Sequence, residues 1–173
     1  EKLIDLARMP SKSISLSSSG YGEELSTSVC RFKKNDFLFG SIRPYFYKAG
    51  ICPFDGVTNS SVFVLRSITD NDKEFLYCYA SSEKVFEKSV QFSSGTKMPI
   101  IRWKDFLDLK FVLPDKKLRN LFSDITRPYF EKIIINIYEI NILKDLRNAI
   151  LPKLISGEIR ISDAEKLVDE AGV

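Results

Sequence analysis

Histidine is absent from this sequence of 173 residues. Its absence removes the most common general base, the Ser-His and Cys-His nucleophile pairs, and every zinc site that needs an imidazole ligand. The sequence also lacks G-x-G-x-x-G after an expected strand and G-x-x-x-x-G-K-[ST], so dinucleotide and P-loop phosphate binding have no support. We therefore expect no catalytic residues, no metal and no cofactor.

Cysteine is scarce, and long apolar runs are missing. Cys30, Cys52 and Cys78 are odd in number and form no C-x-x-C pair, so we expect buried free thiols in a reducing compartment. No apolar run approaches the roughly 20 residues that span a bilayer, and the first residues lack the apolar stretch of a signal peptide. We expect a cytoplasmic protein without a membrane segment. The start at Glu1, without an initiator Met, suggests a processed or truncated chain.

One chemistry has a partial match. Pro114-Asp115 resembles the opening of a metal-binding nuclease motif, which requires an acidic-x-Lys element downstream. The candidate Asp145-x-Arg147 ends in arginine. We therefore expect Pro114-Asp115 to be a turn that ends a strand, and a metal-dependent nuclease fragment stays an alternative.

The periodicity predicts an α+β fold in three regions, residues 1–115, 116–150 and 151–173. The first region alternates short apolar runs with turn residues, which is typical of a mainly β domain. One helix is expected inside it, over about Asp72–Ser89. The expected strands are Ser28–Phe32, Phe37–Gly40, Tyr45–Ile51, Ser61–Leu65 and Phe111–Leu113.

The second region has the period of one long helix, with apolar residues three and four positions apart. At about 1.5 Å per residue this seam runs for roughly 50 Å, which calls for a partner helix, so we expect a coiled coil and a homodimer. Pro128 should kink or restart the helix, and Pro152 and Gly157 should end it before a short helix at Asp163–Glu170. The seam consists of Leu118, Phe122, Ile125, Tyr129, Ile133, Ile137, Ile140, Leu143, Leu146 and Ile150.

The charge is mixed, with 26 Lys and Arg against 23 Asp and Glu, and a net charge of +3 is too small to indicate nucleic acid by itself. Two stretches, Arg31–Lys48 and Lys84–Lys104, nevertheless hold five basic residues and one acid each, interleaved with aromatic residues. Such stretches suit phosphate contacts and a few contacts to base edges. The alternative is that the aromatics belong to the core and the charges to the solvated face of a sheet.

Several motifs resemble one known family. Phe37–Ile51 (FLFGSIRPYFYKAGI) and Pro53–Asn59 (PFDGVTN) resemble the target recognition domain of the specificity subunits of type I restriction-modification systems. Arg8–Leu16 is similar to the opening of that family, Ser94–Trp103 to a later loop, and Leu146–Ile159 to its helix-to-tail signature. The motifs occur in the family's order, and the match runs from about Leu3 to Ile161, nearly the whole chain.

The resemblance implies a protein that performs no chemistry itself. Specificity subunits read a bipartite target in double-stranded DNA, one half-site per recognition domain, and recruit methyltransferase and restriction subunits. Their paired long helices set the gap between the half-sites. Residues 1–115 would then be a recognition domain, residues 116–150 the helix for dimerisation and spacing, and residues 151–173 a C-terminal tail.

A full specificity subunit has two recognition domains and two helices, whereas this chain has one of each. Two explanations stay open: a half-subunit that pairs with itself, or the C-terminal half of a longer protein. Self-pairing would imply a palindromic, interrupted target, because a two-fold dimer reads symmetric half-sites. A different function is also open, in which the long helix binds protein partners and the β domain never touches DNA.

The resemblance also suggests a DNA-binding face. Arg43 is the best candidate for bidentate guanine recognition, and the lysines suit phosphate contacts. One alternative has Arg43 tie loops together through a carboxylate such as Asp55, and another places the base contacts in stretches such as Ser15–Thr27. The expected DNA-binding residues are Lys33, Lys34, Arg43, Tyr45, Lys48, Ser94, Thr96, Lys97 and Arg102.

Overall fold

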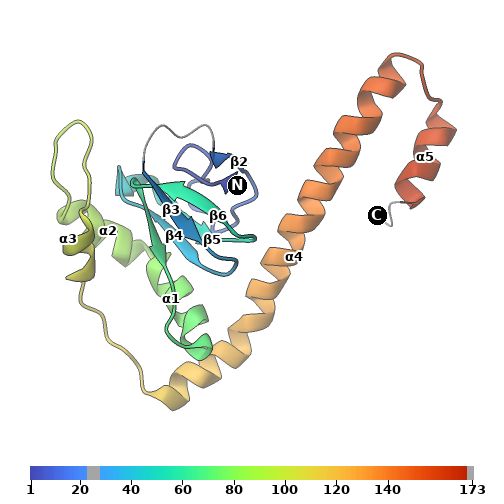
Figure 1. Ribbon diagram of the computed structural model, residues 1–173. Coiled ribbons are helices and arrows are strands. Elements are labelled where there is room, and N and C mark those ends of the chain that lie inside the picture. The colour runs from blue at the N-terminus through green and yellow to red at the C-terminus, as the bar shows by residue number, and fades with distance from the viewer. Residues whose placement is uncertain (23–27, 171–173) are drawn as a thin grey trace. The chain divides into compact units, whose positions relative to one another are not determined.

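The computed structural model describes residues 1–22 and 28–170. The chain divides into two compact units, Glu1–Ile134 and Ile135–Val173 (Figure 1). A helix of 40 residues, α4 (Lys116–Ile155), begins in the first unit and ends in the second. In the part of the chain that the structure describes, no helix is long and apolar enough to cross a membrane.

The described residues of the first unit form two small β-sheets. One sheet has the order β2-β1-β6-β3, in which β1 pairs antiparallel with β2 and parallel with β6, and β3 pairs antiparallel with β6. The other is antiparallel, with the order β5-β4-β7. The strands are β1 (Lys2–Leu3), β2 (Gly20–Tyr21), β3 (Val29–Phe32), β4 (Phe37–Gly40), β5 (Ala49–Ile51), β6 (Gly56–Asn59) and β7 (Val62–Leu65).

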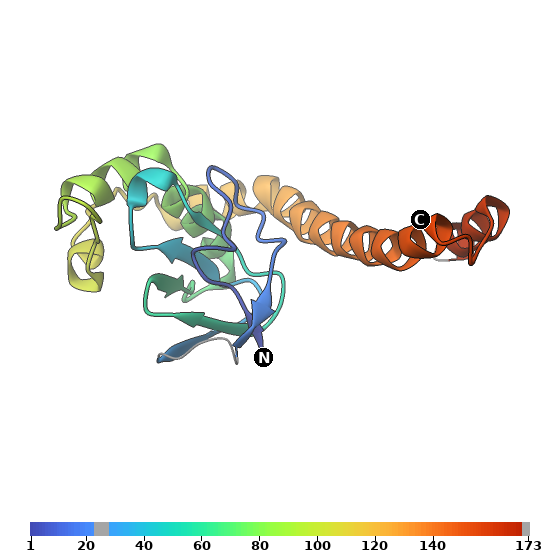
Figure 2. The same ribbon diagram turned by 90° about the horizontal axis from the view of Figure 1, so that it is seen from above.

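Helices cover one side of the β5-β4-β7 sheet (Figure 2). Because side chains alternate along a strand, Phe37 and Phe39 of β4 point to the same side, where Phe37 packs on Tyr77 and Phe39 stacks on Phe86 at a ring distance of 4.8 Å. The helical elements of this unit before α4 are η2 (Pro44–Phe46), η3 (Asp70–Asp72), α1 (Lys73–Ala80), α2 (Glu83–Gln91) and α3 (Trp103–Leu107).

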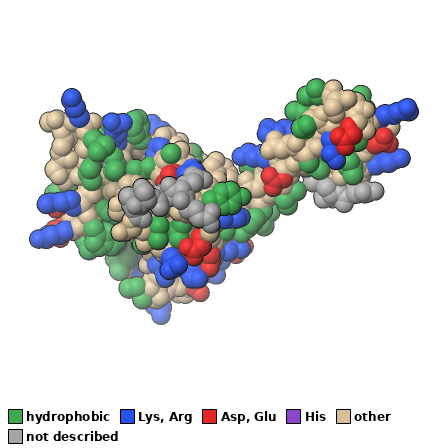
Figure 3. Space-filling view, turned by 45° about the horizontal axis from the view of Figure 1, so that its top comes forward, with side chains coloured by type: hydrophobic (Ala, Val, Ile, Leu, Met, Phe, Trp, Pro, Cys, Tyr) green, Lys and Arg blue, Asp and Glu red, His purple; other side chains and the backbone are tan. Residues whose placement is uncertain are grey.

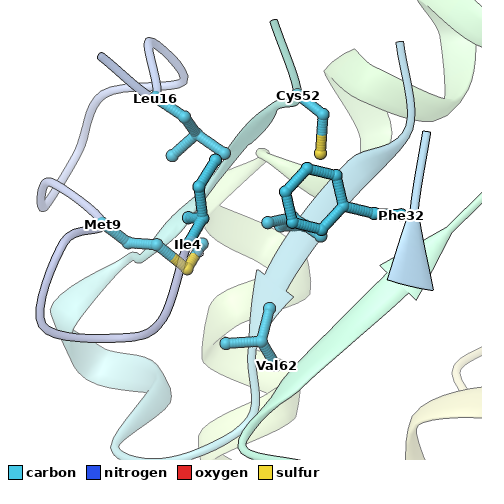
Figure 4. Packing of buried hydrophobic residues seen from close by; sticks show 7 residues of the cluster. Ile4, Met9, Leu16, Phe32, Cys52 and Val62 are labelled. Carbon is cyan, nitrogen blue, oxygen red and sulfur yellow. The ribbon is translucent and has the colours of Figure 1, made fainter. Parts of the chain in front are cut away.

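A second core lies on the other side of β4. Leu38, between the two phenylalanines, joins a cluster of buried side chains from the N-terminal segment and both sheets (Figure 4). The whole of Phe37–Gly40 is buried, which explains its uninterrupted apolar character. The cluster consists of Ile4, Met9, Leu16, Phe32, Leu38, Cys52 and Val62.

Polar contacts fix the start of α4 to α1. Asp115 accepts a hydrogen bond from the Leu118 N–H at 2.9 Å and so caps α4, which is why Pro114-Asp115 is a turn. Further along α4, the buried carboxylate of Glu74 accepts hydrogen bonds from Ser123 Oγ at 2.9 Å and from Arg127 Nε at 3.2 Å. These bonds join two elements that are about 50 residues apart in sequence.

The predicted α+β class is confirmed, with differences in the elements. Of the five expected strands, Phe37–Gly40 is present with its expected bounds and three are present in shorter form, but Phe111–Leu113 is not a strand. Its side chains instead help to line an apolar hollow of about 330 Å³ beside α1 and α3. Neither β6, which begins at Gly56, nor α3 was expected. At Gly56 a Cβ would lie 2.4 Å from the Lys2 carbonyl oxygen, so glycine allows β1 and β6 to approach.

The single helix expected over Asp72–Ser89 is two helices, α1 and α2. The chain breaks at two serines whose hydroxyl groups donate to carbonyl oxygens of the preceding turn: Ser81 to Tyr77 and Ser82 to Tyr79, both at 2.7 Å. Serine hydroxyls compete in this way with the backbone bonds that would continue a helix.

The long helix does not restart at Pro128, nor does it end at Pro152. Pro128 is exposed, so the carbonyl group that loses its N–H partner can bond to water. The helix ends at Ile155, shortly before Gly157, which has a φ of +74° and leads toward α5 (Ile161–Glu170).

All three cysteines are free. Cys52 is buried as expected, whereas Cys30 and Cys78 are exposed, so the expectation of burial is wrong for these two. Cys30 lies on β3, where Val29, Cys30 and Arg31 are all exposed. Burial raises the pKa of the Cys52 thiol far above its ordinary value, which keeps that thiol protonated.

Candidate nucleic-acid interface

Two segments that are about 50 residues apart in sequence form neighbouring loops at one end of β4. We call Arg43–Tyr47 loop A and Ser94–Ile100 loop B. The Arg43 N–H donates to the Pro99 carbonyl oxygen at 2.7 Å, and Ile42 forms a β-bridge with Ile100. Loop B is the yellow-green loop next to α2 and α3 in Figure 1. The structure thus joins the two stretches in which most of the expected DNA-binding residues lie.

Loop A is held in an unusual backbone conformation. Arg43 and Tyr47 have φ values of 50° and 55°, in the left-handed region that costs a non-glycine residue about 1–3 kcal/mol. Between them, Pro44 begins the 3₁₀ turn η2, since its fixed φ suits the first helical position. Phe46 and Tyr47 donate backbone hydrogen bonds to Arg43 and Pro44. Such strain persists only where the surroundings enforce it, and it concentrates at functional sites.

This conformation directs the side chains of loop A in two directions. Tyr47 turns inward and packs against Phe86 of α2, with 4.8 Å between the ring centroids. Tyr45 and Phe46 turn outward, each 43% exposed, with their rings in contact. Arg43 is exposed beside them. Loop A therefore offers a cation and two aromatic surfaces to a ligand.

Loop B is closed by a pair of backbone hydrogen bonds between Ser94 and Ile100, at 3.0 and 3.1 Å. Gly95 has a φ of +100°, and a Cβ at this position would lie 2.9 Å from the Met98 carbonyl oxygen, so the tight turn requires glycine. Thr96, Lys97 and Met98 are exposed at the tip. A hydroxyl group and an ammonium group are thus presented beside loop A.

Lys33 and Lys34 lie away from these loops. They precede β4, whereas loop A follows it, so the strand separates them. Lys33 Nζ forms an ion pair with Asp55 at 2.9 Å, and the Lys34 N–H donates to the same carboxylate at 2.8 Å. These bonds hold the Asp55 pKa below its ordinary value. Asp55 is thus not the carboxylate that ties down Arg43, because its two oxygens bond to Lys33 and Lys34.

Lys48 and Arg102 flank the loops but are engaged within the protein. The Lys48 ammonium donates to the Leu6 carbonyl oxygen. The Arg102 guanidinium binds Asp105 through two hydrogen bonds, of 2.7 and 3.1 Å, which raises the pKa of Arg102 and lowers that of Asp105. Five of the nine expected residues therefore lie on the two loops: Arg43, Tyr45, Ser94, Thr96 and Lys97.

Sequence reasoning missed three residues next to these five. Phe46 and Met98 are exposed on loops A and B, and Lys12 lies against Tyr47. The segment Arg8–Leu16 had been identified as a family motif, but nothing in its pattern singled out Lys12. Of the alternative stretch Ser15–Thr27, residues 23–27 lie outside the described residues.

The surface around the loops is basic without being strongly so. Figure 3 shows Lys and Arg side chains projecting at the left edge of the first unit, where α2, α3 and loop B lie in Figure 1. Across residues 1–22 and 28–170, no three His, Cys, Asp or Glu side chains are grouped so that they could hold a metal ion. The geometry therefore suits binding of a phosphate-bearing ligand on an open surface.

The seam predicted along α4 is partly covered. In the first unit, α4 packs on α1 through Phe122, whose ring lies 6.4 Å from that of Phe75. Five seam residues are exposed: Leu118, Ile125, Tyr129, Ile140 and Leu143. The others are buried or half-buried: Phe122, Ile133, Ile137, Leu146 and Ile150.

Comparison with known proteins gives two matches. The type I restriction modification DNA specificity domain matches residues 7–144, a range that contains both loops. The specificity subunit of the type I restriction enzyme MjaIX from Methanocaldococcus jannaschii is 29% identical over 163 residues, which cover 88% of this chain and 36% of the relative. The chain thus spans about a third of the length of that curated relative.

Proposed function

The chain belongs to the type I restriction modification DNA specificity domain family, and on that premise we propose that it reads one half of a bipartite DNA target through loops A and B. The observation that carries this proposal is the hydrogen bond between the Arg43 N–H and the Pro99 carbonyl oxygen, at 2.7 Å. It fixes both loops on one surface, so that a single duplex can contact them together.

Each exposed side chain has a role in this proposal. The Arg43 guanidinium forms two parallel hydrogen bonds with the major-groove edge of a guanine, a contact worth about 1–3 kcal/mol of discrimination between bases. Lys97 neutralises a backbone phosphate, and Ser94 and Thr96 donate hydrogen bonds to phosphate or base oxygens. Tyr45 supplies apolar contact area with a hydroxyl group at its end.

The long helix is assigned to assembly. Its exposed apolar residues need a cover, and a second long helix supplies one of matching length. We assign residues 1–115 to DNA recognition, 116–150 to dimerisation and spacing, and 151–173 to the tail. The complete assembly would include methyltransferase and restriction subunits that perform the chemistry, so this chain contributes recognition alone.

The solution mass tests self-pairing. Light scattering should give a mass near twice 19.8 kDa at high protein concentration, and a symmetric, interrupted DNA target would follow from such a dimer. Ile140→Asp should shift the mass toward that of the monomer, because it places a charge in the seam. A strict monomer at every concentration would contradict pairing of the chain with itself.

Salt dependence tests DNA binding against the alternative of a protein-interaction module. The probe is a fluorescent 30-bp duplex pool with a randomised centre, titrated with the full chain between 50 and 200 mM KCl. The slope of log K against log salt should be clearly negative, because each phosphate that Lys or Arg neutralises releases about 0.9 counterion. No binding at 50 mM, or a flat slope, would contradict the proposed function.

A further inference from the structure

The N-terminal segment supplies a residue that lies directly against loop A. The Lys12 N–H donates to the Tyr47 carbonyl oxygen at 3.0 Å. The Lys12 ammonium lies over the Tyr47 ring, 5.1 Å from its centroid. Lys12 is therefore bonded through both its main chain and its side chain to the residue that ends loop A.

Backbone conformation singles out Lys12 and Tyr47 together with Arg43. Among the described residues, the non-glycine positions with positive φ are Lys12, Asn35, Arg43 and Tyr47. Asn35 suits this region because asparagine adopts it readily, whereas Lys12, Arg43 and Tyr47 do not share that preference. These three residues lie on connected segments. The Lys12 N–H bonds to the Tyr47 carbonyl oxygen, and the backbone turn from Arg43 to Tyr47 forms loop A. The N-terminal segment thus helps to impose the strained conformation of loop A.

The charge of Lys12 is still available to a ligand. The residue is exposed, and no carboxylate of residues 1–22 and 28–170 forms an ion pair with its ammonium group. A contact with an aromatic face leaves the positive charge in place. One acid lies in the neighbourhood, because Glu83 lines a hollow of about 290 Å³ together with Lys12 and Ser13.

Contacts between segments connect Lys12 with the other cations. Lys12 bonds to Tyr47 at one end of loop A, and Arg43 at the other end bonds to Pro99 of loop B, which also carries Lys97. Lys12, Arg43 and Lys97 are therefore carried by segments that contact one another in turn, so one DNA backbone can approach them together.

We propose that Lys12 is a third component of the DNA-binding surface, where its ammonium group binds a backbone phosphate next to loop A while its main chain holds Tyr47. This inference rests on the proposed function. It adds the segment around Lys12 to an interface otherwise made of loops A and B. It also gives Lys12 a role in affinity for every sequence and not in the choice between bases.

The test compares Lys12→Gln with a matched lysine variant. Lys2 has the same arrangement, with its ammonium group 4.6 Å from the centroid of the Phe54 ring, but Phe54 follows β5 at the end of the sheet away from loop A. Binding of the full chain to the randomised 30-bp duplex pool is measured between 50 and 200 mM KCl. Lys12→Gln should lower the slope by about 0.9 and weaken binding about threefold to tenfold at 50 mM, whereas Lys2→Gln should change neither.

Two further variants separate the phosphate contact from a loss of structure. Lys12→Arg keeps the charge and should keep the wild-type slope. Lys12→Asn removes the charge with a residue that accepts positive φ, and should reproduce the slope of Lys12→Gln. A wild-type slope in both uncharged variants would overturn the inference. Failure of the wild-type chain to bind, or a flat wild-type slope, would instead refute the proposed function.

Discussion

The ion pair between Arg127 and Glu74 should be a major source of stability in the first unit. The Glu74 side chain is 1% exposed and receives hydrogen bonds from Arg127 and from Ser123, whereas the Arg127 side chain is 37% exposed. Replacing Arg127 with Met leaves a buried carboxylate without its cationic partner. Such changes cost about 3–5 kcal/mol. We expect about 3 kcal/mol, at the low end, because Ser123 still bonds to the carboxylate and solvent already screens part of the guanidinium.

Urea denaturation followed by circular dichroism measures this loss. With a slope of about 2 kcal/mol per molar urea, a loss of 3 kcal/mol moves the midpoint down by about 1.5 M. The double variant Glu74→Leu/Arg127→Met is the control, since apolar residues of similar volume can replace both partners of a buried pair with little loss. The double variant should therefore be more stable than Arg127→Met alone. A loss below 1 kcal/mol for Arg127→Met, or losses that simply add in the double variant, would refute the assigned coupling.

Three further predictions concern single side chains. Gly95→Val should weaken binding to the duplex pool at least tenfold, because the strain falls on the exposed loop B. The melting temperature should stay within about 2 °C of the wild-type value. Unchanged binding would count against loop B as part of the DNA-binding surface. NMR titration of the Asp105 carboxyl should give a midpoint below that of an ordinary aspartate. The two hydrogen bonds between Arg102 and Asp105 should therefore persist above that pH and be lost as the pH falls through it. Arg102→Gln should raise the midpoint. A thiol reagent should modify the exposed Cys30 in the folded protein and reach Cys52 only after unfolding; equal rates would contradict the burial of Cys52.

The sequence predicts well those elements whose hydrophobic pattern reflects which of their faces are covered. Phe37–Gly40 is apolar throughout because both of its faces are covered, and a short apolar run bounded by turn residues identifies such a strand. The spacing of apolar residues by three and four positions likewise predicts the long helix α4. Phe111–Leu113 has the composition of a strand, yet it pairs with no strand in the described part of the chain, and Phe111 and Leu113 line a hollow beside α1 and α3. Local composition cannot tell these two situations apart, because strand pairing is a long-range property.

The candidate interface was predictable in composition but not in arrangement. Basic and aromatic residues marked the stretches that contain loops A and B. The contact between the two loops depends on the β-bridge between Ile42 and Ile100, which no local sequence pattern predicts. Lys33 and Lys34 carried the same signal and lie beyond the other end of β4, since a strand carries its two flanking segments apart. Lys12 went unnoticed because its position depends on the left-handed conformation of Tyr47.

In the proposed function, loop A reads DNA sequence through Arg43. Repeated selection of bound duplexes from the randomised pool, followed by sequencing, tests it most directly when wild type is compared with Arg43→Gln. Arg31→Gln is the matched control, because Arg31 is an exposed arginine on β3, outside both loops. Wild type and Arg31→Gln should enrich the same short motif, and Arg43→Gln should lose preference for guanine at one position by about 5-fold to 150-fold. A motif that is unchanged in Arg43→Gln, or no enriched sequence with the wild-type chain, would contradict the account.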